Sequence, residues 1–167
     1  MSDRPKLSGV SISDVDLSRG RISDSRLTNV AGIKVKGVEL ALRNIEVKES
    51  RVGVLDLGGA DLKTVLFERC KLGCVLLRGA RAADVTFENC LIEELDLTGA
   101  SIARLSLPGS SIQTLTLSME SATGLDLREA KLKALSGTQS LYGVIFNEHQ
   151  LMQFAEQFVQ QLGARIL

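Results

Sequence analysis

Apolar residues recur at every fifth position along most of the chain. From Leu42 to Leu132 every fifth residue is apolar, and the same period extends back to Leu7. A second column lies two residues before the first and largely alternates between large and small side chains from Leu55 to Leu135. A helix has a period of 3.6 and a strand a period of two, so a period of five fits neither as a single element. The pattern predicts a chain that turns a corner every five residues and points two of each five side chains inward.

The same columns repeat every twenty residues. Phe67 and Phe87 fall in one column, and Gly59, Gly79 and Gly99 fall in another, where a tight corner favours a residue without a Cβ atom. Large inward residues on two opposite faces and small ones on the other two predict a cross-section with two bulky walls and two slim ones. Such a stack leaves an edge at each end, and both ends need caps.

The pattern is weakest at residues 28–41. Gly32 and Gly37 fall where leucine is expected, and Ile33 and Val38 lie one position late. We interpret this as a one-residue insertion followed by a one-residue deletion that restores the frame by Leu42. The segment is either a bulge or small loop in one coil, or a functional loop, because departures from a strict repeat are frequent places for sites.

Short motifs along the repeat resemble those of the pentapeptide-repeat family. Ala60-Asp61-Leu62-Lys63-Thr64 matches the family motif closely, and looser matches begin at Cys70, Ala100 and Ala130. The resemblance covers residues 6–135 and implies an all-β solenoid, a right-handed quadrilateral β-helix with twenty residues per coil. We therefore expect a repeat domain at residues 1–135 with about 6.5 coils.

The C-terminal segment differs in kind from the repeat. Residues 136–147 are predicted to be a linker, and residues 148–167 an amphipathic helix over 148–162 followed by a tail. Asn147 and Gln150 have the spacing of a capping box, and Gly163 is a natural stop. The apolar stripe of this helix comprises Leu151, Phe154, Ala155, Phe158 and Leu162. This stripe either closes the end of the solenoid or packs against a second copy, and the two roles are compatible. The resemblance supports the second role, because some family members dimerise through C-terminal segments.

Residues that carry chemistry are sparse. Cys70 and Cys90 lie at inward positions and are interpreted as small wall residues with reduced thiols, while Cys74 is predicted to point outward. His149 is the one histidine, which excludes most histidine-based metal sites. No nucleophile elbow, P-loop or dinucleotide fingerprint occurs. We expect no enzyme activity, no metal and no cofactor.

The charge balance limits the classes of partner. Twenty basic and twenty acidic residues give a formal net charge of zero, which argues against a strongly basic nucleic-acid binder and a strongly acidic chain. Direct binding to nucleic acid is therefore not expected. No apolar stretch is long enough to span a membrane, and the start at Met1 to Pro5 lacks the apolar segment of a signal peptide. These features predict a cytoplasmic protein that makes no contact with membranes.

Two sets of outward positions are candidates for partner binding. One is a group of acidic residues in the middle coils, and the other is a group of leucines where polar residues are expected. The acidic set is Glu68, Glu88, Glu93, Glu94 and Asp96, and the apolar set is Leu66, Leu76 and Leu91.

The sequence therefore predicts a non-catalytic scaffold that binds an unidentified protein along a rigid rod. The face that it uses is not determined by the sequence. The resemblance implies an alternative, because one branch of the family mimics duplex DNA and binds DNA gyrase. A DNA mimic needs a long continuous negative stripe, and the arginines and lysines of this chain interrupt its acidic positions.

Overall fold

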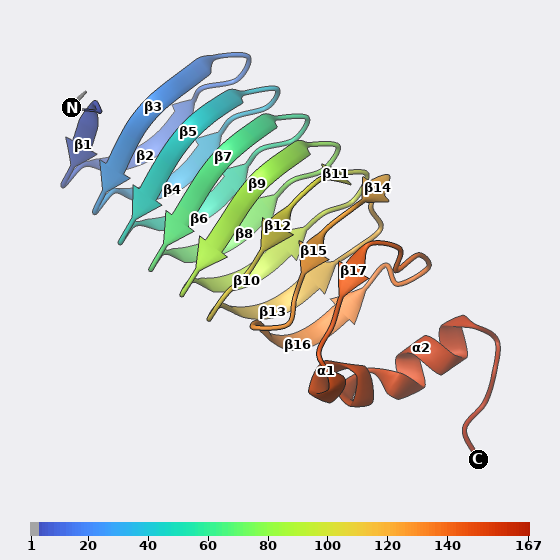
Figure 1. The fold of residues 1–167 in the computed structure, drawn as a ribbon. Coiled ribbons are helices and arrows are strands. Elements are labelled where there is room, and N and C mark those ends of the chain that lie inside the picture. The colour runs from blue at the N-terminus through green and yellow to red at the C-terminus, as the bar shows by residue number, and fades with distance from the viewer. Residues whose placement is uncertain (1–3) are drawn as a thin grey trace.

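The computed structural model describes residues 4–167 and shows a parallel β-solenoid of about seven coils, followed by two short helices (Figure 1). The solenoid expected from the five-residue period is therefore confirmed. The first three residues lie outside the described residues, and with them lies part of the start that we expect to lack a signal peptide. Within residues 4–167 no helix is long and apolar enough to cross a membrane.

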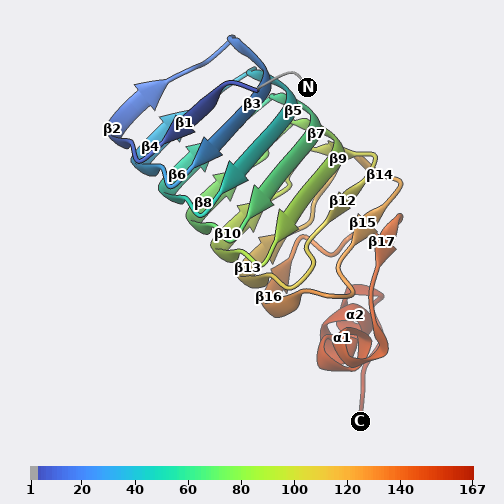
Figure 2. The same cartoon turned by 60° about the vertical axis from the view of Figure 1, so that its left-hand side comes forward.

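The strands form two sheets that run the length of the rod. Seven strands stack in one of them (Figure 2): β2 (Ser11–Asp16), β4 (Ala31–Lys36), β6 (Arg51–Asp56), β8 (Lys71–Leu76), β10 (Leu91–Asp96), β13 (Ser111–Thr116) and β16 (Lys131–Ser136). The other sheet contains β1 (Lys6–Ser8), β3 (Arg21–Thr28), β5 (Ala41–Lys48), β7 (Asp61–Glu68), β9 (Arg81–Glu88), β11 (Ser101–Ile102), β12 (Leu105–Ser106), β14 (Ser121–Ala122), β15 (Leu125–Asp126) and β17 (Val144–Ile145). The pairing is parallel, and up to β16 each residue faces the one twenty positions later.

Most corners use residues in the left-handed region of backbone conformation. In the first coil these are Arg19, Asp24 and Asn29, with φ between 50° and 61°. The middle one bends the long strand β3 without ending it, and Asn44, Thr64 and Asp84 do the same in β5, β7 and β9. Asp and Asn tolerate this region better than most residues. In the described chain Asp84 is the last of these mid-strand residues with a positive φ. In the next two coils a pair of short strands, β11 with β12 and β14 with β15, takes the place of the one long strand.

The core consists of the two inward columns that the sequence predicts. Inward side chains from Leu55 to Leu135 are almost fully buried, with the exception of Glu120, which is exposed. Phe67 and Phe87 stack with ring centroids 4.7 Å apart and planes 5° apart. Cys70 and Cys90 are free thiols buried in the slim wall, where Ser110 donates its hydroxyl to the carbonyl of Phe87 at 2.7 Å.

The expected insertion and deletion at residues 28–41 is wrong. β4 keeps the twenty-residue register on both sides, and Gly32 faces Ile12 and Val52 directly. Ile33 points outward with 68% of its surface exposed. Shifting the register by one residue would turn every side chain of the strand to the opposite face, whereas glycine at an inward position leaves the hydrogen-bond ladder intact. No loop forms, and the second coil has two inward positions without side chains.

The C-terminal segment departs from the expected linker and single helix. β17 lies within the expected linker and pairs with β15, so the solenoid extends to Ile145. The helix is divided into α1 (Glu148–Gln153) and α2 (Ala155–Gln161), because Phe154 leaves helical geometry at φ −106° and ψ 11°. The break places Phe154, which is 7% exposed, against the last coil. The predicted capping box is confirmed, since Asn147 and Gln150 each accept a backbone N–H from the other.

Candidate interaction surfaces

The predicted acidic residues do not gather on one surface. Glu68 and Glu88 face each other on β7 and β9, whereas Glu93 and Glu94 lie on β10 in the other sheet. Glu68 is paired with Lys48 at 3.3 Å and with Arg69 at 3.6 Å. Within residues 4–167, Glu88, Glu93 and Glu94 make no ion pair. These three are the carboxylates of the predicted set that no cation of the described chain neutralises, although Glu94 accepts the thiol of Cys74.

Asp96 is not an exposed acid as predicted, because its neighbours cover the side chain and leave the residue 4% exposed. Its carboxylate accepts hydrogen bonds from Arg78 Nε at 2.5 Å and from the backbone and hydroxyl of Thr98 at 3.0 and 2.6 Å. Burial by itself would raise the pKa of Asp96, but the bonds from Thr98 and Arg78 outweigh it and hold the pKa below its usual value. Asp96 therefore joins two coils and is not available to a partner.

Asp96 should make the stability of the protein depend on acid. Its depressed pKa contributes stability that is present above the unfolded-state pKa of about 3.9 and is lost as the pH falls through the folded-state value. We expect Asp96→Asn to lower the free energy of unfolding by about 1–3 kcal/mol at pH 7. The difference from wild type should shrink toward pH 2. Urea unfolding between pH 2 and pH 7 measures this, with the exposed Asp14→Asn as control; a difference that does not change with pH would contradict the assignment.

The three predicted leucines also lie apart. Leu66 is half-buried on β7 in one sheet, while Leu76 and Leu91 belong to the other sheet. Leu76 ends β8 and Leu91 begins β10, where Leu91 faces Lys71 at the far end of β8. Leu91 is 56% exposed. The leucines therefore do not form one patch, and only Leu91 is a strongly exposed apolar residue.

Ion pairs between successive coils run along the outside of the rod. Arg19 pairs with Glu39 at 3.0 Å and Arg26 with Glu46 at 2.6 Å, each across the twenty-residue offset. Others are Arg69 with Glu49, Arg81 with Asp61 and Arg104 with Asp84. Exposed pairs of this kind contribute at most about 1 kcal/mol each. Their main consequence is electrostatic, because stacked opposite charges interrupt a continuous negative stripe.

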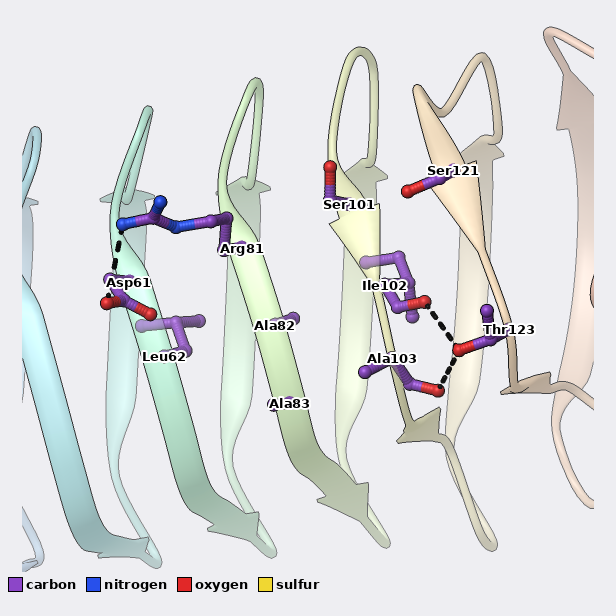
Figure 3. Close-up of a pocket in the computed structure, with 10 residues that line it drawn as sticks. All are labelled: Asp61, Leu62, Arg81, Ala82, Ala83, Ser101, Ile102, Ala103, Ser121 and Thr123. Carbon is purple, nitrogen blue, oxygen red and sulfur yellow. Dashed lines mark hydrogen bonds and ion pairs between the residues drawn. The ribbon is translucent and has the colours of Figure 1, made fainter.

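A shallow groove of about 300 Å³ crosses the face where the long strand is replaced by short ones (Figure 3). The Asp61–Arg81 ion pair lies at one end, and Thr123 at the other end donates its hydroxyl to the carbonyl of Ala103 at 3.0 Å. The hollow exists because the outward side chains at its floor are small; these residues are Ala83, Ser101, Ala103 and Ser121. The sequence analysis did not identify this groove; the small residues at twenty-residue spacing are the signal that could have indicated it.

Glutamines of α1 and α2 close the C-terminal edge of the solenoid. Gln150 Nε2 donates to the carbonyls of Leu127 and Ala130 at 2.6 and 2.9 Å. Gln153 and Gln157 donate to the carbonyls of Leu132 and Leu135 at 2.7 and 3.0 Å. These bonds supply donors to carbonyls that have no further coil to bind them. The sequence analysis missed this role, although the spacing 150, 153 and 157 places the three amides on one helical face.

The predicted apolar stripe of the C-terminal helix is divided between two surroundings. Phe154 and Phe158 pack on the core, and the ring of Phe158 lies 5.5 Å from that of Phe146. Ala155 is half-buried. Leu151 and Leu162 are 52% and 85% exposed, and Met152, which was not predicted, is 74% exposed. One part of the stripe therefore caps the rod, and the other part faces outward.

In residues 4–167 no three side chains among His, Cys, Asp and Glu lie close enough together to hold a metal ion. Cys74 is half-buried, and its thiol donates to Glu94 at 3.6 Å. Burial and the charge of Glu94 raise the pKa of Cys74, so the thiol is less reactive than an ordinary one.

No protein-family model matches the chain, and no curated protein matches it. Among solved structures the chain is similar to full-length QnrB1, a plasmid-mediated fluoroquinolone resistance protein, with 12% identity over 92% of this chain and 99% of that one, and a TM-score of 0.41. Two trypsin-treated QnrB1 variants match with 11% and 13% identity over 99% and 97% of this chain and 95% and 100% of theirs, each with a TM-score of 0.34. Likeness at this level supports no argument about function. The five-residue period and the parallel β-solenoid are consistent with a pentapeptide-repeat protein.

Proposed function

We propose that this protein is a non-catalytic scaffold of the cytoplasm that binds another protein and acts as a homodimer through its C-terminal helices. The observation that carries the proposal is the outward part of the helical stripe. Leu151, Met152 and Leu162 are exposed although Phe154 and Phe158 already close the end of the rod. Capping therefore does not account for these three side chains, and a second copy would remove them from water.

The rod suits a display role because its outer side chains are held at fixed spacing. Every coil is bonded to its neighbours through parallel ladders, so outward residues keep their positions relative to one another. The groove on the side of the rod is shallow, and we propose neither a substrate nor a cofactor for it. The exposed residues Leu91 and Glu93 on β10 and the small-residue groove on β9, β11 and β14 are the surfaces we assign to a protein partner.

The homodimer gives a direct test. We expect wild-type protein at about 50 μM to have the mass of a dimer by light scattering. Met152→Glu with Leu162→Glu should give a monomer with unchanged circular dichroism, because a buried unpaired carboxylate opposes association. Leu91→Glu, on the side of the rod, should leave the dimer intact. A wild-type monomer at this concentration would contradict the proposed interface.

Binding to DNA gyrase is the second candidate function. It is favoured by the three middle-coil carboxylates that make no ion pair within the described chain, Glu88, Glu93 and Glu94, and opposed by the ion pairs that break the negative stripe. A gyrase supercoiling assay with the protein titrated in, with and without a quinolone, separates the two candidates. We expect no effect at micromolar protein. Inhibition or protection that is lost in Glu93→Lys with Glu94→Lys, but kept in the matched control Glu148→Lys, would favour the gyrase function instead.

A further inference from the structure

Three exposed side chains stand in one row along the outside of the rod. Arg51 begins β6, Lys71 begins β8 and Leu91 begins β10, and these strands are neighbours in one sheet (Figure 2). The parallel register places Lys71 directly between Arg51 and Leu91. All three side chains are exposed, Leu91 to 56%. We call these three residues the β6–β10 row.

The two cations of the row have no counter-charge within residues 4–167. Neither Arg51 nor Lys71 makes an ion pair there, although like charges directly opposite one another destabilise a sheet. Like charges also face each other elsewhere in the ladders, at Lys6 and Arg26, at Arg43 and Lys63 and at Glu68 and Glu88. One member of each of these pairs has an ion pair, with Glu46, Asp61 and Lys48 respectively. At the β6–β10 row the repulsion is left for an anionic group from outside the chain to relieve.

A hollow of about 470 Å³ beside the two cations gives such a group room to approach. The one carboxylate among its lining residues is that of Glu49, which is bonded to Arg69 at 3.0 Å and so does not neutralise the row. Ala31, one coil before Arg51, adds only a methyl group to the lining. Together with Arg51, Lys71 and Arg69, the hollow is lined by three cations and one anion.

The surroundings of the row favour a protein over a nucleic acid. The row continues from Lys71 to the apolar Leu91, and Glu93 and Glu94 follow on the same strand without an ion pair in the described chain. A phosphate backbone carries charge at every step and would meet these carboxylates directly after the two cations. A protein segment can instead place acidic residues opposite the cations and an apolar residue opposite Leu91.

The spacing of the row favours a helix over an extended strand as the element that binds it. Successive members of the row are one coil apart, about 4.8 Å. One helical turn rises about 5.4 Å, whereas residues on one side of a strand are about 6.7 Å apart. Over the two steps of the row the mismatch is about 1 Å for a helix and about 4 Å for a strand. A helix with acidic residues at i and i+4 and an apolar residue at i+7 presents all three on one face.

We propose that the β6–β10 row binds a partner helix that carries two acidic residues one turn apart and an apolar residue one turn further on. The carboxylates contact Arg51 and Lys71, and the apolar side chain contacts Leu91. The inference rests on the proposed scaffold function and names the chemistry of the partner at this surface. The C-terminal helices and the homodimer are not involved.

A designed helix tests the proposal directly. The probe is a fluorescein-labelled peptide of about 20 residues, rich in Ala and Gln, with Glu at i and i+4 and Leu at i+7. Fluorescence anisotropy should show one probe per chain, with at least tenfold lower affinity for the same peptide with Gln in place of both Glu residues. Binding should weaken at least fivefold between 50 and 300 mM salt, because exposed ion pairs are screened. Equal affinity for the Glu and Gln peptides would overturn the proposal.

A charge exchange assigns the binding to the row. Arg51→Glu with Lys71→Glu should weaken the Glu peptide at least tenfold and should bind a peptide with Lys at i and i+4 at least tenfold better than wild type does. Lys131→Glu with Lys133→Glu is the matched control, because it makes the same change in charge at exposed positions of the same sheet. It should leave both affinities within twofold of wild type. An equal loss in the control would mean that only net charge matters and would overturn the assignment.

Measurements on the wild-type protein decide the outcome even if the exchanged variant does not fold. Methyl NMR with the Glu peptide should shift Leu91 and leave Leu151 and Leu162 unchanged, and the opposite pattern would overturn the proposal. A 20-base-pair DNA duplex that displaces the peptide at equal concentration would overturn it in favour of a nucleic acid. Light scattering keeps the proposed homodimer separate: a wild-type monomer that binds the peptide contradicts the dimer alone, and a dimer that does not bind the peptide contradicts the β6–β10 row alone. A dimer that is lost in Arg51→Glu with Lys71→Glu would mean that a second copy occupies the row and would also overturn the proposal.

Discussion

Phe87→Ala is expected to lower the free energy of unfolding by about 3–5 kcal/mol, the range for removing a fully buried aromatic ring. Phe87 is 0% exposed and stacks on Phe67 in the middle of the rod. The parallel ladders hold the surrounding coils at fixed spacing, so the site cannot collapse to fill the space. Urea denaturation followed by circular dichroism measures the loss.

Leu91→Ala is the matched control for Phe87→Ala. It removes a large apolar side chain from the next strand, β10, at a position that is 56% exposed, so its effect should stay below about 1 kcal/mol. Equal effects of the two substitutions would show that the stacked phenylalanine column does not stabilise the rod more than its surface does.

Gln150→Ala is expected to lower the free energy of unfolding by about 2–4 kcal/mol, because the buried Ala130 carbonyl loses its donor, the Leu127 carbonyl keeps only the Ala130 N–H, and the capping box loses one of its two bonds. The side chain is 2% exposed and makes three hydrogen bonds, to Asn147, Leu127 and Ala130. The same substitution should free α1 from the last coil. Limited proteolysis near residue 150 and urea denaturation measure the two effects.

Gln150→Glu distinguishes the two roles of this side chain. A carboxylate can still accept the Asn147 N–H and complete the capping box, but it cannot donate to Leu127 and Ala130. If closure of the edge is the main role, Gln150→Glu should be at least as destabilising as Gln150→Ala. Recovery of wild-type stability in Gln150→Glu would assign the effect to the cap instead. Gln160→Ala is the surface control, because Gln160 bonds only to Glu156 on the same helix.

Local pattern was sufficient for most of the architecture. Inward positions such as Leu57 and Val75 follow from a count along the chain, because each coil repeats the same geometry and neighbouring coils impose one register. The Asn147–Gln150 capping box was predictable for a similar reason, since both partners lie within one helical turn. Where the interacting residues are separated by a fixed spacing, the sequence is sufficient to predict their contact.

Contacts without such a fixed spacing were not predictable. Whether Gly32 belonged to an insertion or to the regular register depended on the ladder bonds to the coils on either side. Asp96 was expected at the surface, and its burial depends on where the Arg78 side chain extends. The candidate leucines Leu66, Leu76 and Leu91 are ten and fifteen residues apart, and they lie at different places around the coil, one on the first sheet and two at opposite ends of strands in the second.

The sequence alone therefore determined the repeat, the inward columns and the beginning of the C-terminal helical segment. Only the tertiary structure decided how the C-terminal end is closed, by Phe154 and the glutamines of α1 and α2. The physical reason is that a periodic sequence specifies the contacts of a coil with coils like itself. The last coil has no further coil of the described chain to bind, and its contacts with the helices depend on side-chain lengths and packing that no period describes.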